Sequence, residues 1–157
     1  MSEARTISVD VVSDVMCPWC LIGKRRLEQA LDRLDDDISV QVRWRPYQLD
    51  ATLPAEGKDR KKYLEDKFGG PERAQHVYAS IEDAGRAENI DFKFSDIAVS
   101  PNTLDALRLI RWAQNEGEDV QGRLVERLFQ MFLLEGRNIG KREVLIEAAG
   151  RAGMDPG

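Results

Sequence analysis

Two cysteines separated by two residues are the part of this chain with the clearest capacity for chemistry. They are Cys17 and Cys20 in the segment MCPWCLIGKRR, with Pro18 and Trp19 between them, and the chain has no other cysteine. A pair with this spacing can form a redox-active disulfide, supply half of a zinc site, or consist of two inert buried thiols. The surrounding residues must distinguish these three interpretations.

The cysteine pair is predicted to lie where a strand gives way to a helix. Pro18 suits the first helical turn, because its missing N–H group would have no partner within the helix. Cys17 then faces the unpaired N–H groups and the positive end of the helix dipole, and both favour a thiolate. Cys20 lies one turn later on the apolar stripe of the helix, so we expect it to point inward. That stripe continues through Leu27, Leu31 and Leu34. An exposed thiol of low pKa can attack a substrate disulfide, and a shielded second thiol can resolve the mixed disulfide.

The zinc and inert-thiol interpretations fit the sequence less well. A structural zinc site needs four ligands, and the chain offers no third cysteine and a single histidine, His76, on a polar helix. We therefore expect no metal and predict that His76 is solvated. Two inert thiols would leave Pro18 and the strand-to-helix junction as coincidences. Two interpretations stay open for Trp19, an exposed contact for substrate or a side chain packed over the motif.

The elements that position the motif follow from hydrophobic periodicity. Residues 6–12 alternate like a strand, residues 18–34 have helical spacing, and residues 38–45 alternate again. Pro46 cannot donate to a sheet and is expected to close the second strand. This order predicts an α/β fold that begins with a parallel βαβ unit. After the turn-rich segment ATLPAEGKD, only helical periodicity is found. The predicted helices cover residues 60–68, 71–88, 100–114 (with Ser100 as its cap and Pro101 first), 120–136 and 141–153.

Composition narrows the classes of partner. The chain has 157 residues, 42% of them hydrophobic, and a net charge of −5, which suits one globular domain with a core. No basic patch is interleaved with aromatic residues, so no nucleic acid partner is expected. No apolar run approaches the ~18 residues of a membrane span, and MSEARTISVDVVSDV has no signal-peptide pattern. We expect a cytoplasmic protein, in which a cysteine pair is more often catalytic or metal-binding than a structural disulfide.

Four segments together resemble a known protein family. They are VDVVSDVMCPWCLIGKRRLEQAL, VRWRPYQLDATLPAEG, SPNTLDALRLIRWA and REVLIEAAGRAGMDPG. Together they resemble the FrnE-like branch of the DsbA-type thiol–disulfide oxidoreductases. The resemblance implies a thioredoxin-like fold with a helical domain inserted after the second strand. Residues 1–50 would form the βαβ half with the CxxC motif, and residues 51–157 the helical insertion domain.

The same resemblance implies roles for individual residues. Cys17 would be the attacking thiol and Cys20 the resolving thiol, with their disulfide as the redox group and no separate cofactor. The segment around Pro46 and the turn that contains Asn102 would face the cleft between the two parts. The implied partners are thiols and disulfides of proteins or small molecules.

The sequence departs from the family pattern in two places. Leu107 stands where the family often has a histidine, so a polar role at that position is absent. The family continues past the last helix into two strands and a closing helix, with a cis-proline loop that docks substrate opposite the motif, whereas this sequence stops at Gly157. We therefore expect an incomplete member with weak exchange activity. It would be either a homodimer joined through its strands or a destabilised fragment with a better-ordered helical part.

Two alternative functions stay open. The glutathione-dependent hydroxychromene-carboxylate isomerases and kappa-class transferases share the implied fold and helical insert. They typically carry a serine at the first motif position and lack the second cysteine, so the CPWC motif argues against this assignment. The other alternative is a non-catalytic binding module, which the missing substrate-docking half would support.

Overall fold

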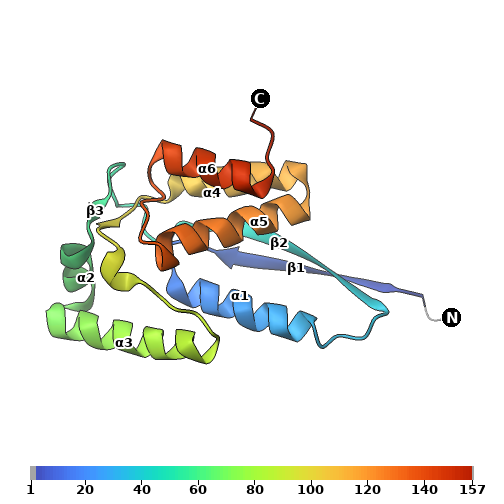
Figure 1. Cartoon of the computed structure of the whole chain (residues 1–157), viewed down its shortest axis with the longest axis horizontal. Helices are drawn as coiled ribbons and strands as arrows, with labels where there is room; N and C mark the ends of the chain where they lie inside the picture. The colour runs from blue at the N-terminus through green and yellow to red at the C-terminus, as the bar shows by residue number, and fades with distance from the viewer. Residues whose placement is uncertain (1–2, 157) are drawn as a thin grey trace.

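Two parallel strands joined by a helix form the part of the fold that carries the CxxC motif. The computed structural model describes residues 3–156. Its first three elements are β1 (Arg5–Ser13), α1 (Pro18–Leu31) and β2 (Ile38–Pro46) (Figure 1). The strands pair in parallel register, with Val9 opposite Val42 and Val11 opposite Trp44. The predicted βαβ unit is confirmed, and the second strand ends at Pro46 as expected.

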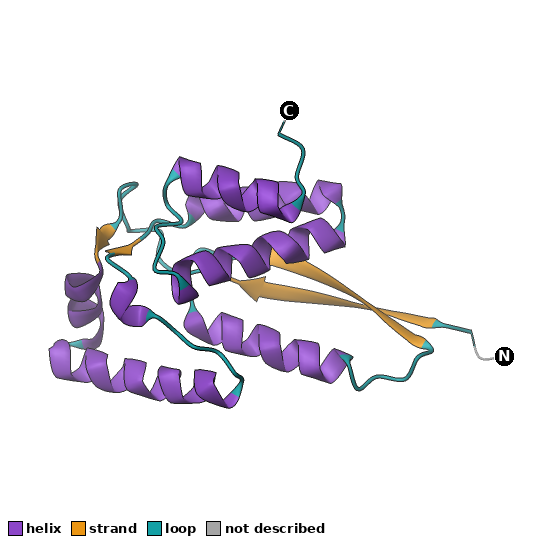
Figure 2. Ribbon diagram, viewed as in Figure 1, coloured by secondary structure: helices purple, strands orange, loops and turns teal. Residues whose placement is uncertain are grey.

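The remainder of the chain is mainly helical (Figure 2). Its elements are β3 (Lys58–Asp59), α2 (Arg60–Phe68), α3 (Pro71–Ala87), η1 (Phe94–Asp96), β4 (Val99–Ser100), α4 (Leu104–Ala113), η2 (Gln114–Glu116), α5 (Glu118–Phe129), η3 (Gln130–Leu134) and α6 (Arg142–Ala152). The helices predicted over residues 60–68, 71–88 and 141–153 are confirmed to within a residue. Helices α4 and α5 pack against β2, which joins the helical part to the βαβ unit.

The first helix is shorter than predicted. It ends at Leu31, and Leu34 lies beyond it with 39% of its surface exposed. The N–H groups of Arg33 and Leu34 donate to carbonyls three residues back, at 3.2 Å in both cases. The chain therefore tightens into turns after Leu31, and the predicted inward stripe does not reach Leu34.

The prediction that Ser100 caps the fourth helix is wrong. Ser100 belongs to β4, which pairs antiparallel with β3 through the register Lys58 opposite Ser100. This close approach requires Gly57, whose φ is +78° and where a Cβ atom would lie 2.6 Å from the Ser100 carbonyl oxygen. Helix α4 begins instead at Leu104, after Thr103 as N-cap residue. Two-residue strands give no periodicity, so the sequence pattern missed this pair.

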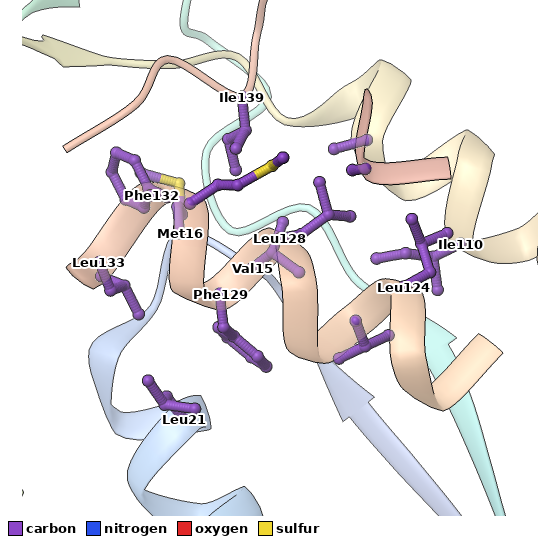
Figure 3. Close-up of a cluster of buried hydrophobic side chains, with 14 of the residues drawn as sticks. Val15, Met16, Leu21, Ile110, Leu124, Leu128, Phe129, Phe132, Leu133 and Ile139 are labelled. Atoms are coloured by element: carbon purple, nitrogen blue, oxygen red, sulfur yellow. The ribbon is translucent and has the colours of Figure 1, made fainter. Parts of the chain in front are cut away.

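The core is centred on α5 and the π-helical turn η3 that follows it. Phe129 and Phe132 are its largest fully buried side chains, and Leu21 of α1 packs into the same cluster (Figure 3). The sequence predicted one continuous helix over residues 120–136. The helix changes to π geometry at Gln130, and the three consecutive residues Met131 to Leu133 are all buried.

The end of the β1–β2 ribbon that lies away from the CxxC motif extends past the helices (Figure 2). Residues 5–8 of β1 are all exposed, and Ile7 keeps 46% of its surface accessible. Val12 is 63% exposed. The inward valines Val9 and Val42 are only half-buried. The helices thus cover one face of the ribbon near the motif, whereas its far end and the opposite face, which carries Val12, stay exposed.

A buried glutamine, Gln121, forms hydrogen bonds with the edge of β2 that does not pair with β1. The Gln121 Oε1 atom accepts from the Trp44 N–H at 3.0 Å, and its Nε2 donates to the carbonyls of Trp44 and Ile110 at 3.1 and 3.0 Å. Gln121 is fully buried, so water cannot replace these bonds.

We expect Gln121→Leu to lower the free energy of unfolding by about 2–3 kcal/mol, because it leaves buried backbone groups of Trp44 without partners. Urea unfolding followed by circular dichroism measures this change. The matched control is Gln75→Leu on the exposed side of α3, which should stay within about 0.5 kcal/mol of the wild type. Equal stability of the Gln121→Leu protein and its control would contradict this role.

Candidate functional site

The CxxC motif lies at the N-terminus of α1, as predicted. Cys17 is the N-cap residue and Pro18 is the first residue of the helix. Both thiols are half-buried, so Cys17 is less exposed than expected and Cys20 is only partly shielded. The fully enclosed positions of the first turns belong to Leu21 and Ile22, and Cys20 only packs against the edge of that core.

The two thiols are held in different protonation states. The Cys20 thiol donates a hydrogen bond to the Cys17 sulfur, and this contact does most to lower the pKa of Cys17 from its ordinary 9.0 to about 6. Burial opposes the shift, and the backbone N–H groups of Cys20 and Trp19 add to it. The same hydrogen bond, followed by burial, raises the pKa of Cys20. At neutral pH, Cys17 is therefore mainly a thiolate and Cys20 keeps its proton.

A buried carboxyl group, Asp14, lies three residues before Cys17 and was not proposed as a site residue. Its Oδ2 atom accepts hydrogen bonds from the Leu49 N–H at 2.9 Å and the Thr103 hydroxyl at 3.0 Å. Its Oδ1 atom is buried and has no hydrogen-bond partner among residues 3–156. Burial raises the pKa of Asp14, against the hydrogen bonds that it accepts. The negative charge of Asp14 raises the pKa of Cys17 as well as that of Cys20, after the larger causes given above.

We expect Asp14→Asn to lower the pKa of Cys17 below that of the wild type, because it removes this negative charge and keeps an oxygen that can accept from Leu49 or Thr103. Thiolate absorbance near 240 nm, followed against pH, measures the shift. Asp36→Asn in the exposed turn after α1 removes one charge at a distance and should leave the midpoint in place. A higher midpoint in Asp14→Asn than in Asp36→Asn would contradict this account.

The remaining predicted residues surround the motif in different ways. Trp19 is 49% exposed, which fits the exposed interpretation, and its contact with a substrate stays a prediction. Pro46 is half-buried at the end of β2. Asn102 accepts from Gln48 Nε2 at 3.1 Å and donates to the Leu53 carbonyl at 2.6 Å. The structure thus brings the segment after β2 and the turn before α4 together, and Asp14 joins both of them to the motif.

A cavity of about 220 Å³ opens beside Cys17, and its lining contains neither Pro46 nor Asn102, the two residues that the family resemblance placed at a cleft. Its lining combines apolar side chains with polar ones from α2 and α3. The polar residues are Arg60, Tyr63, Lys67 and Tyr78. The sequence holds one indication of a special role for Arg60: it begins a helix, where the positive end of the helix dipole disfavours a cation. A larger hollow of about 640 Å³ shares Leu49, Tyr63 and Lys67 with this cavity.

The described residues show no sign of a metal site or of a membrane-spanning helix. His76 is exposed on α3, as predicted. Within residues 3–156 no three histidine, cysteine or acidic side chains are grouped as metal ligands would be. Among the same residues, every helix is too short or too polar to cross a membrane.

Comparison with known proteins places this geometry in a family. Residues 8–157 match the model of the DSBA-like thioredoxin domain. The chain is 27% identical over 152 residues to the uncharacterized protein YwbO of Bacillus subtilis, which covers 96% of this chain and 68% of YwbO. A probable DsbA oxidoreductase of Streptomyces coelicolor is 28% identical with a TM-score of 0.82, over 94% of this chain and 63% of that one.

A second solved structure supports the fold alone. A putative protein disulfide isomerase of Nitrosomonas europaea is 13% identical with a TM-score of 0.66, over 94% of this chain and 65% of that one. The chain therefore spans slightly less than two thirds of both solved proteins. Its α/β architecture, with a helix-bearing thioredoxin-like fold, agrees with the expected fold class. With the match extending over residues 8–157, the chain belongs to the DSBA-like thioredoxin domain family.

Proposed function

We propose that this protein is a thiol–disulfide oxidoreductase of the FrnE-like type that acts in the cytoplasm. The observation that carries the proposal is the geometry of the motif: Cys17 is the N-cap residue of α1 and accepts a hydrogen bond from the Cys20 thiol, which lowers the pKa of Cys17 to about 6. A thiolate at neutral pH is the nucleophile that disulfide exchange requires. Membership of the DSBA-like family supports the same chemistry.

The proposed reaction has two exchange steps. The Cys17 thiolate attacks one sulfur of a substrate disulfide, the substrate S–S bond breaks, and one substrate thiolate leaves and takes a proton from solvent. Cys20 then loses its proton and attacks the Cys17 sulfur, which releases the second substrate thiolate. The protein ends with a Cys17–Cys20 disulfide, and the substrate has gained two electrons and two protons. The reverse sequence oxidises a dithiol substrate.

Insulin reduction by dithiothreitol, followed as turbidity, tests this proposal. Micromolar protein should shorten the lag before insulin precipitates, and the Cys17→Ser, Cys20→Ser double variant should not. If the lag is unchanged, a glutathione titration separates the two alternatives. Saturable glutathione binding would favour the isomerase or transferase, and no binding would favour the non-catalytic module.

A further inference from the structure

The cavity beside Cys17 contains a buried guanidinium group without a carboxylate partner. Arg60 is only 5% exposed, and none of the acidic residues in the described part of the chain forms an ion pair with it. Its Nη2 atom donates to the Tyr78 hydroxyl at 3.0 Å and its Nη1 atom makes a long contact with Ser100 Oγ at 3.4 Å. Its Nε atom has no acceptor among these residues.

Aromatic rings hold this cation in place but do not neutralise it. The guanidinium carbon lies 5.2 Å from the centre of the Tyr78 ring and 5.6 Å from that of Phe132. Such contacts compensate partly for a desolvated cation. Arginine keeps its charge in proteins, so burial leaves a positive potential at this wall of the cavity.

Arg60 polarises the hydroxyl group of Tyr78, which lines the same cavity as Cys17. The Tyr78 hydroxyl oxygen accepts from Arg60, which makes its own O–H group a stronger donor. Burial, together with the charge of Cys17, keeps the pKa of Tyr78 above its ordinary value, so the O–H proton is retained. Lys67 lines the same cavity, with its ammonium group 5.9 Å from the Tyr63 ring centre and 5.5 Å from that of Phe68. Two cations and a phenol donor thus surround a space that also contains the thiol of Cys17.

We propose that this cavity binds the carboxylate of a small thiol or disulfide, with the Tyr78 hydroxyl and the Lys67 ammonium as its direct contacts and Arg60 as the charge behind them. The substrate sulfur would then lie at Cys17. A volume of about 220 Å³ suits a short arm of a few carbon atoms that ends in a carboxylate. This proposal rests on the proposed exchange function and names a substrate class for it. It runs against the bulk electrostatics, because the net charge of −5 and the Cys17 thiolate both repel an anion.

Three disulfides of similar length and different charge test the preference. They are 3,3′-dithiodipropionate (anionic), bis(2-hydroxyethyl) disulfide (neutral) and cystamine (cationic). Reduced protein is mixed with an excess of each, quenched with acid, and its oxidation is measured by mass spectrometry. Each rate is divided by that of free mercaptoethanol thiolate with the same disulfide, which removes intrinsic reactivity. We expect the normalised rate to be at least tenfold higher for the anionic disulfide than for the neutral one, and lowest for cystamine.

Variants then assign the preference to the cavity. Tyr78→Phe removes the donor and keeps the ring over Arg60, and Lys67→Gln removes the second cation. Each should lower the ratio of anionic to neutral rates at least threefold. Lys61→Gln removes the same charge from an exposed position of α2 that does not line the cavity, and should leave the ratio unchanged. Arg60 is left intact, because its removal would change core packing as well as charge.

The outcomes separate this proposal from the proposed function. Equal normalised rates for the three disulfides, or equal losses in Lys67→Gln and Lys61→Gln, would overturn the carboxylate site while exchange itself stands. If no disulfide reacts, calorimetric titration of the Cys17→Ser, Cys20→Ser protein with 3,3′-dithiodipropionate decides. Binding that Tyr78→Phe weakens at least threefold would support the site although the exchange function fails, and no binding would overturn both.

Discussion

Cys17→Ser is expected to lower the rate of disulfide exchange by at least about a hundredfold, to the uncatalysed rate. A serine hydroxyl is not ionised at neutral pH, and we expect that Cys20 does not take over, because burial still raises its pKa once the hydrogen bond to the Cys17 sulfur is lost. Exchange is measured as the shortening of the lag in insulin precipitation.

Cys20→Ser should stop the reaction one step later. The Cys17 thiolate still attacks the substrate disulfide, but no second thiol releases the product. After incubation with oxidised glutathione and acid quenching, mass spectrometry should find most of the Cys20→Ser protein with one glutathione on Cys17. The Cys17→Ser protein should carry almost none, and the double variant serves as the unreactive control. Faster labelling of Cys20 in Cys17→Ser than of Cys17 in Cys20→Ser would reverse the assignment of the two roles.

Local sequence rules predicted the part of the site that depends on neighbouring residues. The alternation around Val9 and Val42, and the proline after Cys17, each specify an element within a few residues of itself. The βαβ unit and the position of Cys17 at the start of α1 were therefore predictable. The same rules predicted that Cys20 faces the core, which it does, but not that it would be only half-buried, because the fully enclosed places in the first turns belong to Leu21 and Ile22.

The rest of the site depends on contacts between distant segments. Asp14 meets Thr103, 89 residues later, and Arg60 meets Tyr78 across the junction of α2 and α3. Neither pairing leaves a periodic pattern in the sequence. Serine is a residue type that often caps helices, but Ser100 instead pairs with Lys58 between β4 and β3. Polar contacts between distant segments are thus the part of the site that the sequence alone does not predict.

The pH dependence of Cys17 reactivity is the second large effect that the structure predicts. With the pKa of Cys17 at about 6, half of it is thiolate at pH 6, against roughly one part in a thousand for a thiol with a pKa of 9.0. A thiolate of lower pKa is also a weaker nucleophile, which removes part of this advantage. At pH 6 we expect Cys17 to react with iodoacetamide roughly 20-fold faster than an ordinary thiol, and its rate should level off above about pH 7.

Labelling between pH 4 and 9, followed by peptide mapping, measures this profile, with Cys20 remaining largely unlabelled. Because the Cys20 thiol is the main cause of the low pKa, Cys20→Ala should move the midpoint upward, whereas Cys20→Ser keeps a hydroxyl donor and should move it less. The lowered pKa of Cys17 also predicts how the stability of the reduced protein changes with pH. The Cys17 thiolate stabilises the reduced fold most above the unfolded thiol's pKa near 9, and this contribution is lost as the pH falls through about 6. A midpoint near pH 8 or above in the wild type, or equal midpoints in Cys20→Ala and Cys20→Ser, would show that the hydrogen bond between the two thiols does not set the reactivity of Cys17.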